Sequence, residues 1–323
     1  MTPGPPIWVV GAGGLLGGAI VRLAGTHGRD VLVSSIPWHD AAAAATALAQ
    51  DLDAVVVRAA GGPWDLLWCA GSGVTSTGER LLDAEVRTIR QFIDEAIERH
   101  GAGLGRGAVF MASTAGGIYA GSVDPPFDEL SPPQPLSAYG EAKLAAEKEF
   151  ARLAAEVGCR VLVGRMSNLY GPGQNLAKSQ GLISQLCRSQ LLGEPIGVYV
   201  SLDTVRDYLF VDDAAALILD GLAMLRDRAS AGSTVVKILA SQRSSSVAAV
   251  LGEFRRIFKR GQLLRLAASA QSGQQARDLR FRSVVWTDLD RRTMTPLPAG
   301  IAATAADIGR RIRAGELAAV ART

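Results

Sequence analysis

The stretch Ile7-Trp-Val-Val-Gly11-Ala-Gly-Gly14-Leu-Leu-Gly17, close to the N-terminus, decides the predicted fold. It opens with a short continuous apolar run, which is the pattern of a strand buried on both faces of a parallel sheet. Gly11, Gly14 and Gly17 allow a tight turn, close approach of a pyrophosphate to the backbone, and close packing of the next helix on the strand. A second strand-like run over 30–35 completes the context of a dinucleotide site, although a plain tight turn would use the same glycines.

The end of the second predicted strand leaves the choice of dinucleotide open. This strand ends in Ser34 and Ser35, with neither an acidic nor a basic residue. A carboxylate at this point usually holds the ribose 2′-hydroxyl of NAD, and a basic residue favours the 2′-phosphate of NADP. The two serines are therefore compatible with NAD or with NADP. Trp38, which follows closely, is a candidate to lie against the adenine ring, or else it packs on the surface.

Beyond this unit, apolar runs typical of strands alternate with stretches of helical periodicity. The alternation predicts an α/β fold with a Rossmann-type doubly wound parallel sheet. A smaller C-terminal α/β substrate domain is expected beside this sheet. Only one helix separates the second predicted strand from the third, so we expect the sheet to lack a strand that related folds carry. The predicted helices cover 39–60, 79–99, 137–157, 182–191, 214–225, 247–258 and 303–320, and the further predicted strands cover 64–70, 107–113, 160–164 and 196–200.

The chain is expected to divide into two domains. Residues 1–165 and about 204–240 are expected to form a dinucleotide-binding Rossmann domain. Residues about 166–203 and 241–323 are expected to form the substrate-binding domain. A chain of 323 residues is long enough for two such units with an interface between them, or for one large α/β domain with additions.

Composition and charge favour a globular enzyme in a reducing, cytoplasmic setting. Hydrophobic residues make up 48% of the chain and the net charge is only +3, which gives little support to nucleic-acid or membrane-surface binding. Cys69, Cys159 and Cys187 are widely separated and indicate neither a disulfide framework nor a metal site. The apolar N-terminal segment lacks a basic region before it and is interpreted as strand, turn and helix, not as a signal peptide. No membrane span is expected.

Tyr139 and Lys143 are four positions apart on a predicted helix, for which Ser137 is a candidate N-cap. Residues at this spacing lie on one face of a helix. An ammonium group beside a phenol favours its ionised form, which general acid–base catalysis near neutral pH requires. The same spacing also occurs on many exposed helices, so the pair gains weight only from motifs elsewhere in the chain.

Such motifs do occur, in a fixed order. The chain resembles the extended short-chain dehydrogenase/reductase family, and within it the NAD-dependent epimerase/dehydratase branch that acts on nucleotide sugars. The resemblance spans most of the chain to about residue 215 and is loose beyond that point. It rests on Gly11-x-x-Gly14-x-x-Gly17, Ser113-Thr114 with Ile118-Tyr119, Tyr139-x-x-x-Lys143, Arg165-Met-Ser-Asn168-Leu-Tyr-Gly-Pro-Gly-Gln174, and Arg206-Asp-Tyr-Leu-Phe-Val-Asp-Asp213.

The resemblance implies a catalytic group. Tyr139 would be the acid or base at a sugar hydroxyl or ketone, and Lys143 would hold the nicotinamide ribose and favour the tyrosinate. Thr114 would hydrogen-bond the reacting oxygen. An extra glycine in Ala115-Gly-Gly-Ile118 makes Ser113 a rival for that role. Capping of the strand end is the alternative role for both hydroxyls.

The resemblance also implies the residues that contact cofactor and substrate. Asn168 and Arg206 match positions that contact the nucleotide diphosphate, for which a planar guanidinium fork is suited. Their alternatives are a turn-stabilising asparagine and an ion pair of Arg206 with Asp207. Leu182, Val198 and Tyr199 would line the nucleotide base, with a core role as the alternative for the first two. The implied NAD or NADP contacts are Gly11, Gly14, Leu15, Leu16, Gly17, Ser34, Ser35, Ala70, Gly71, Tyr139, Lys143 and Met166.

Three readings of the function follow. The first is an NAD(P)-dependent epimerase that acts on a nucleotide sugar through a transient keto intermediate. The second is an NADPH-dependent nucleotide-sugar 4-ketoreductase, and the third is a non-catalytic dinucleotide-binding protein. A 4,6-dehydratase is not expected, because Ala115-Gly116-Gly117 supplies no carboxylate where family dehydratases carry an acidic pair.

Two further expectations come from the resemblance. Helices 79–99 and 139–157 would pair with those of a second copy in a four-helix bundle, which predicts a homodimer. Glu85 stands on the first of these helices, where relatives often carry asparagine. The residue types alone give no reason for that exchange.

Overall fold

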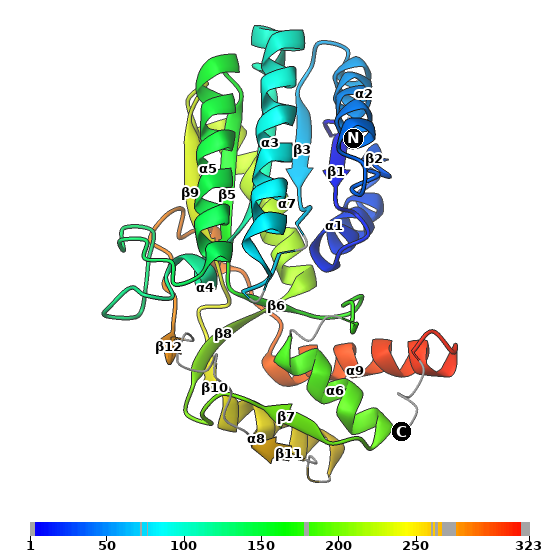
Figure 1. Cartoon of the computed structure of the whole chain (residues 1–323), viewed down its shortest axis with the longest axis vertical. Helices are drawn as coiled ribbons and strands as arrows, with labels where there is room; N and C mark the ends of the chain where they lie inside the picture. Colours follow the sequence, from blue (N-terminus) through cyan, green and yellow to red (C-terminus); the bar gives the residue numbers. More distant parts are fainter. Residues whose placement is uncertain are drawn as a thin grey trace.

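The computed structural model describes residues 4–71, 73–75, 77–177, 181–259, 261, 264–266 and 276–317 (Figure 1). At its centre is a six-stranded sheet in the order β2-β1-β3-β4-β5-β9, in which each neighbouring pair is parallel. This sheet confirms the predicted Rossmann-type fold. Its strands are β1 (Ile7–Val10), β2 (Val31–Val33), β3 (Trp64–Trp68), β4 (Gly107–Thr114), β5 (Arg160–Met166) and β9 (Thr234–Leu239).

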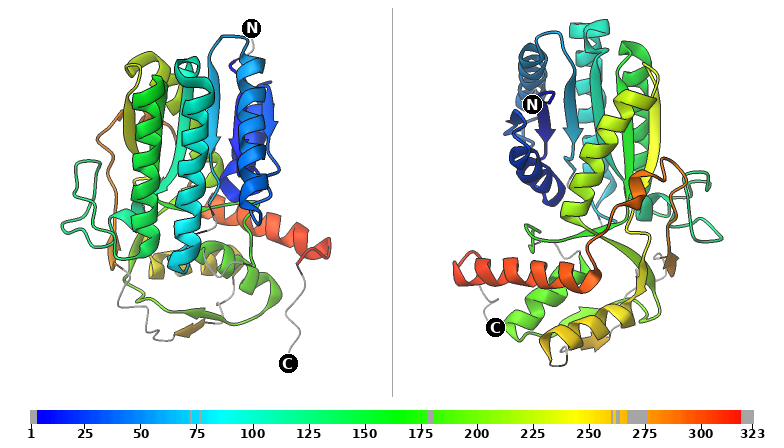
Figure 2. Two further views of the ribbon diagram at one scale, coloured as in Figure 1. Left: turned by 45° about the horizontal axis from the view of Figure 1, so that its top comes forward. Right: turned by 180° about the vertical axis from the view of Figure 1, so that it is seen from behind.

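Helices cover both faces of the sheet (Figure 2). Helices α1 (Leu15–Thr26) and α7 (Val211–Arg228) pack on one face. Helices α2 (Ala41–Ala59), α3 (Glu79–His100) and α5 (Ala138–Val157) pack on the other. Strand β1 is buried on both sides because its alternate residues enter the two core clusters. The apolar run that predicted this strand is thus explained by burial on two faces.

Strand β2 is the outermost strand on its side of the sheet among the described residues. The chain runs from β1 to β2, then through α2 to β3, which pairs with the opposite side of β1. The predicted loss of a strand is confirmed for the described residues, because α2 alone connects β2 to β3. The strand order reverses beside β1, and ligands of such sheets bind at the carboxyl ends of the strands at this point.

A second group of elements lies beyond the carboxyl ends of the sheet (Figure 1). A cluster rich in isoleucine, leucine and phenylalanine holds its helices together. The predicted boundaries between two domains remain a prediction. The group contains β6 (Asn168–Tyr170), α6 (Leu182–Leu192), β7 (Ile196–Val198), β8 (Val205–Phe210), β10 (Ser244–Ser246), α8 (Val247–Phe258), β11 (Leu264–Leu266), β12 (Asp278–Leu279) and α9 (Leu297–Arg313).

The last helix differs from its prediction over 303–320. Helix α9 begins earlier, at Leu297, and ends at Arg313. Pro298 lies in its first turn, where the missing N–H of proline leaves no helical hydrogen bond unmade. The helix therefore starts at the segment that contains the prolines, six residues before the predicted start. Residues 318–320 lie outside the described part of the chain.

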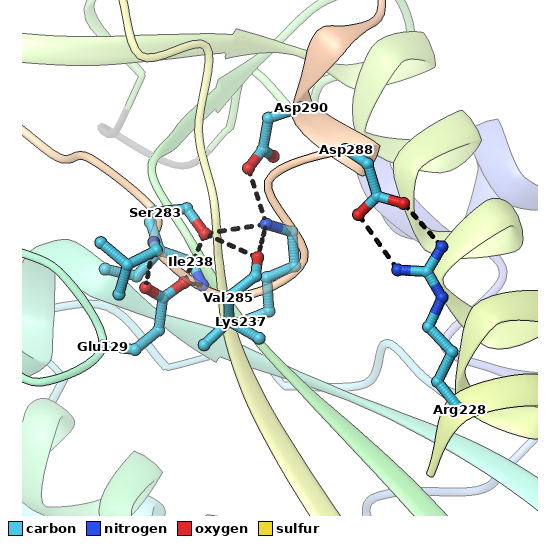
Figure 3. A network of polar contacts seen from close by, with 9 residues as sticks. Glu129, Arg228, Lys237, Ile238, Ser283, Val285, Asp288 and Asp290 are labelled. Carbon is cyan, nitrogen blue, oxygen red and sulfur yellow. Dashed lines mark hydrogen bonds and ion pairs between the residues drawn. The ribbon is translucent and has the colours of Figure 1, made fainter.

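Strand β9 was not among the predicted strands, because Lys237 interrupts its apolar run. Lys237 is fully buried and donates to Ser283 Oγ at 2.8 Å, to the Val285 carbonyl at 2.7 Å and to Asp290 Oδ2 at 2.9 Å (Figure 3). Glu129 accepts a hydrogen bond from the Ile238 N–H at 2.7 Å. The side chains of two distant segments thus cover the open edge of the sheet, which an unpaired strand would otherwise expose.

No helix in the described ranges combines the length and the apolar content needed to cross a bilayer.

Candidate functional site

The glycine turn after β1 is shaped by close backbone packing. Gly11 has a φ of +89°, and a Cβ atom there would lie 2.6 Å from the Ala70 nitrogen. A Cβ atom at Gly17 would lie 2.3 Å from the Gly11 carbonyl oxygen. Gly14 caps α1 without a side chain, and a Cβ atom at Gly13 would meet nothing within 4 Å. The first N–H groups of α1 are therefore not covered by side chains, and the turn fits a pyrophosphate.

Other predicted cofactor residues lie at the ends of further strands or at the start of α1. Ala70 and Gly71 directly follow β3, and Met166 ends β5. Leu15 and Leu16 begin α1 and belong to its core-facing cluster, so these two residues would meet a dinucleotide through their backbone. The strands β1, β3 and β5 therefore all end beside residues that the resemblance assigned to the cofactor.

The serines after β2 have different surroundings. The Trp8 indole N–H donates to Ser34 Oγ, while Ser35 is exposed. Trp38 is half-exposed and packs edge-to-face against the buried Trp68, with 6.5 Å between ring centroids. Among these residues, only Ser35 has a hydroxyl that faces solvent, so it is the better placed of the two serines to meet a ribose.

Tyr139 and Lys143 lie on one face of α5, in its first two turns. The helix begins at the predicted cap, because Ser137 Oγ accepts from the Gly140 N–H at 3.4 Å. Lys143 Nζ is 6.0 Å from the centroid of the Tyr139 ring. A Cβ atom at Gly117 would lie 3.2 Å from the ring of Tyr139, so this glycine leaves the space that the phenol occupies.

The ammonium of Lys143 has a carboxylate partner. Glu85, on α3, accepts a hydrogen bond from Lys143 Nζ at 3.0 Å. Burial by itself lowers the pKa of Lys143, but Glu85 and, to a smaller extent, Tyr139 raise it, and the net pKa lies above its ordinary value. Lys143 is therefore a charged group at neutral pH, although it is nearly buried.

The two candidate hydroxyls at the end of β4 differ in their partners. Ser113 is buried and donates to Glu147 Oε1 at 2.5 Å. Thr114 is partly exposed, and its Oγ1 accepts from the Gly117 N–H at 3.1 Å, as a cap of the short helix α4 (Ala115–Ile118). The Thr114 hydroxyl accepts in that bond and keeps its own proton for donation. Thr114 and the Tyr139 ring both lie against Gly117, where a Cβ atom would be 2.8 Å from Thr114 Cγ2 and 3.2 Å from the ring.

A buried ion pair beneath the site was not predicted as a functional feature. Arg165 binds both carboxylate oxygens of Glu147, at 3.0 Å and 2.7 Å, and donates to Tyr119 Oη at 2.6 Å. Glu147 stands one helical turn after Lys143, so the spacing of four from Tyr139 through Lys143 to Glu147 was the available signal. The pair engages Ser113 and holds β4, β5 and α5 together.

Arg206, on β8, lacks a carboxylate partner in the part of the chain that the structure describes. Its Nη1 donates to the Val205 carbonyl at 2.8 Å, and burial lowers the pKa of its guanidinium. The alternative pairing with Asp207 is not formed, because Asp207 accepts instead from Ser167 at 2.7 Å and from Ser241 at 2.9 Å. A partly buried cation without an anion is suited to bind one.

The remaining substrate residues are distributed over three elements. Asn168 begins β6 and is exposed. Leu182 begins α6 and packs on the apolar cluster that α6 shares with α8 and α9. Val198 is 3% exposed, so both residues are in the position of core residues. Tyr199 is half-exposed, and its hydroxyl lies against Gly197. The described contacts therefore bring Asn168 and Arg206 to adjacent strands, since β6 pairs with β8.

Comparison with known proteins identifies the family. The model of the NAD dependent epimerase/dehydratase family matches residues 7–236. The dTDP-L-rhamnose 4-epimerase of Burkholderia thailandensis is 25% identical over 270 residues, which cover 69% of this chain and 74% of that protein. The dTDP-4-dehydro-6-deoxyglucose reductase of Escherichia coli is 31% identical over 105 residues, which cover 32% of this chain and only 33% of that protein.

Solved structures agree on the fold. The structure of MoeE5 in complex with UDP-glucose and NAD superimposes with a TM-score of 0.77 at 22% identity, covering 95% of this chain and 99% of that one. At this identity the likeness concerns the fold alone.

Proposed function

This chain belongs to the NAD dependent epimerase/dehydratase family, and from that premise we propose that it is an NAD(P)-dependent epimerase acting on a nucleotide sugar through a transient keto intermediate. One observation carries the proposal. Tyr139 and Lys143 share a face of α5, and Thr114 ends the neighbouring strand β4 with a hydroxyl free to donate. The glycine turn that fits a dinucleotide lies at the same end of the sheet.

The chemistry of these side chains is proton transfer matched to hydride transfer. When bound, the nicotinamide supplies the acceptance and return of a hydride at a sugar carbon. Tyr139 removes the proton of the sugar hydroxyl as the C–H bond breaks, so that a ketone forms without accumulating charge on its oxygen. Thr114 donates a hydrogen bond to that oxygen, and Lys143 favours the ionised phenol. Return of proton and hydride to the other face of the ketone gives the epimer, with no net gain of electrons.

The remainder of the substrate requires an anion site. Arg206 is a partly buried guanidinium whose pKa burial lowers and which makes no ion pair among the described residues, and a diphosphate would supply its counter-charge. Asn168, on the adjacent strand β6, would add an amide donor. These two residues support a nucleotide-linked substrate more than a free sugar.

The candidate site has no carboxylate where a dehydration would require one. Ala115, Gly116 and Gly117 follow Thr114 and carry no acid. The nearest carboxylates described around Lys143 are both engaged, Glu147 with Arg165 and Glu85 with Lys143 itself. An elimination of water would need an acid free to protonate the leaving hydroxyl.

A reductase is the second candidate. Strand β2 ends in Ser34 and Ser35 with no acid to hold a ribose 2′-hydroxyl, and the matched Escherichia coli relative is a reductase. In this reaction a 4-keto sugar takes a hydride from NADPH at carbon and a proton from Tyr139 at oxygen. Each turnover then consumes one NADPH and one proton from solvent. A protein that only bound the dinucleotide would not need the arrangement of Tyr139, Lys143 and Thr114.

Turnover without added cofactor tests the proposal. The purified protein is incubated with UDP- and dTDP-hexoses, and the epimeric product is detected by NMR. The Tyr139→Phe variant should lower the rate by about 10²–10⁴-fold, because the proton acceptor is lost. Epimer formation with only the cofactor that the protein retains, or with substoichiometric NAD, is the expected result. Strict dependence on stoichiometric NADPH would replace the epimerase by the reductase.

A further inference from the structure

Glu85 is the counter-charge of Lys143, and it comes from a different helix. The two residues are 58 positions apart, on α3 and α5, and their side chains meet at 3.0 Å. The Lys143 side chain is 9% exposed and that of Glu85 is 22% exposed. The pair lies directly against Gly71, where a Cβ atom would be 2.9 Å from Glu85 Oε1 and 3.0 Å from Lys143 Nζ. The ion pair therefore touches the backbone that follows β3, at the edge where the dinucleotide residues gather.

No other described carboxylate is free to neutralise Lys143. Glu147 also acts on Lys143 through its charge, but Arg165 binds both of its oxygens. The charges around the phenol thus form two neutral pairs, Lys143 with Glu85 and Arg165 with Glu147. Removal of the Glu85 charge alone would leave one uncompensated positive charge at this edge.

We propose that Glu85 is a positioning residue that acts through Lys143 and makes the site prefer the oxidised, positively charged form of the nicotinamide cofactor. This inference rests on the proposed function, in which Lys143 meets the nicotinamide ribose. The nicotinamide ring carries a positive charge when oxidised and none when reduced. A lone buried ammonium would repel the oxidised ring, and the paired carboxylate of Glu85 reduces that repulsion. Lys143 still acts directly on Tyr139, because its Nζ lies 6.0 Å from the centroid of that ring.

The preference has a direct use in an epimerase. Each cycle of such an enzyme starts from the oxidised cofactor, which must stay bound while the sugar is exchanged. A carboxylate that lowers the repulsion of the oxidised form keeps the resting enzyme in its active state. Asparagine, which relatives often carry at this place according to the resemblance, could accept a hydrogen bond from Lys143 but would not cancel its charge.

The experiment measures binding of both cofactor forms, with no substrate present. Dissociation constants for NAD⁺ and NADH, and for NADP⁺ and NADPH, are determined by calorimetry for the natural chain and for Glu85→Gln. The amide keeps an acceptor for Lys143 and removes the charge. We expect the ratio of the oxidised-form Kd to the reduced-form Kd to rise on the order of tenfold, the effect of one unit charge at about 10 Å with an effective dielectric constant of about 20.

Two further variants serve as controls. Glu85→Asp retains the charge and should keep the ratio within about twofold of the natural value. Asp83→Asn removes the same charge from an exposed position on α3 and should also leave the ratio unchanged, because solvent screens it. These variants also separate the charge effect from a loss of folding, since a merely structural defect would weaken the binding of both cofactor forms alike.

The outcomes are distinct. An unchanged ratio in Glu85→Gln, with both forms still bound, would overturn this inference and leave the proposed function intact. Failure of the natural chain to bind any of the four dinucleotides would overturn both. A raised ratio in Glu85→Gln together with an unchanged ratio in Asp83→Asn supports the inference.

Discussion

Two buried lysines, Lys143 and Lys237, show how the same residue type is used in two ways. Lys237 on β9 has three described acceptors, Ser283 Oγ, the Val285 carbonyl and Asp290 Oδ2, which match the three N–H donors of an ammonium (Figure 3). Lys143 on α5 has one described acceptor, Glu85, and lies near the ring of Tyr139. A structural lysine thus has its donors filled by the fold, whereas a lysine at the candidate site keeps donors for a ligand.

Loss of Lys143 is expected to have the largest effect on activity. Lys143→Met should lower kcat/KM by about 10²–10⁴-fold, because proton transfer by Tyr139 loses its fixed charge. Its midpoint of thermal unfolding should change little, since Glu85 is left partly exposed to water. Lys148→Met, on an exposed position of the same helix, is the matched control and should keep full activity. Equal losses in the two variants would contradict the contrast.

Loss of Lys237 should act on stability instead. Lys237→Met is expected to lower the free energy of unfolding by about 3–5 kcal/mol, because it leaves the Asp290 carboxylate without its buried partner. Chemical denaturation measures this change, and cofactor affinity at 25 °C should remain within about twofold of the natural value. A second substitution, Asp290→Asn, should restore part of the loss. Normal stability with lost cofactor binding would mean that Lys237, too, serves the site.

Thr114 and Ser113, the neighbouring hydroxyl residues of β4, offer the same comparison between a candidate catalytic residue and a structural one, with smaller expected effects. Thr114→Val should lower kcat by about 10²-fold, because one donor to the reacting oxygen is removed. Ser113→Ala should cost about 1–3 kcal/mol of stability, because the buried Glu147 loses a donor, and should spare kcat. Steady-state kinetics and denaturation of the two variants decide between them. The reverse pattern would assign the catalytic role to Ser113.

Substitution of Arg206 tests whether this guanidinium, which has no described ion-pair partner, binds the substrate. Arg206→Gln should raise KM for a nucleotide sugar by about tenfold or more, since charge-assisted bonds to phosphate are worth about 1.5–3 kcal/mol each. Its folding stability should not fall, because the guanidinium gives up only contacts to backbone carbonyls. An unchanged KM for the nucleotide sugar would remove Arg206 from the binding site.

The smallest expected effects come from the ion pairs on the helices that are predicted to form the homodimer interface. The outward sides of α3 and α5 carry ion pairs within one chain, Arg90 with Glu149 at 2.7 Å and Arg152 with Asp94 at 2.6 Å. The pair of Arg152 with Asp94 is exposed, and such pairs contribute about 0–1 kcal/mol. Light scattering should give twice the mass of the chain if the two helices pair as predicted, and Arg152→Ala should leave unfolding nearly unchanged. A monomeric mass would contradict the predicted homodimer and would mean that this face of α3 and α5 stays exposed to solvent.

Part of the candidate site could be predicted from local sequence patterns. The spacing of Tyr139 and Lys143 needs only the helical repeat, and the structure has both on one face of α5. The turn from Gly11 to Gly17 needs only the steric freedom of glycine between a strand and a helix. By contrast, the rivalry of Ser113 and Thr114 was open, because a one-residue difference in a strand decides which face a side chain takes.

The sequence alone was therefore enough to predict the apolar strands and their alternation with helices, the glycine turn and the Tyr139–Lys143 face, because each of these patterns depends on residues within a few positions of each other. Only the tertiary structure decided the partners. Lys143 meets Glu85 across 58 positions, and Lys237 meets Asp290 across 53. Such contacts are set by how helices and strands pack, and the energy of a buried charge depends on its final neighbours. For that reason the partner of Glu85, a residue that the sequence left unexplained, was identified only when α3 was seen beside α5 (Figure 1).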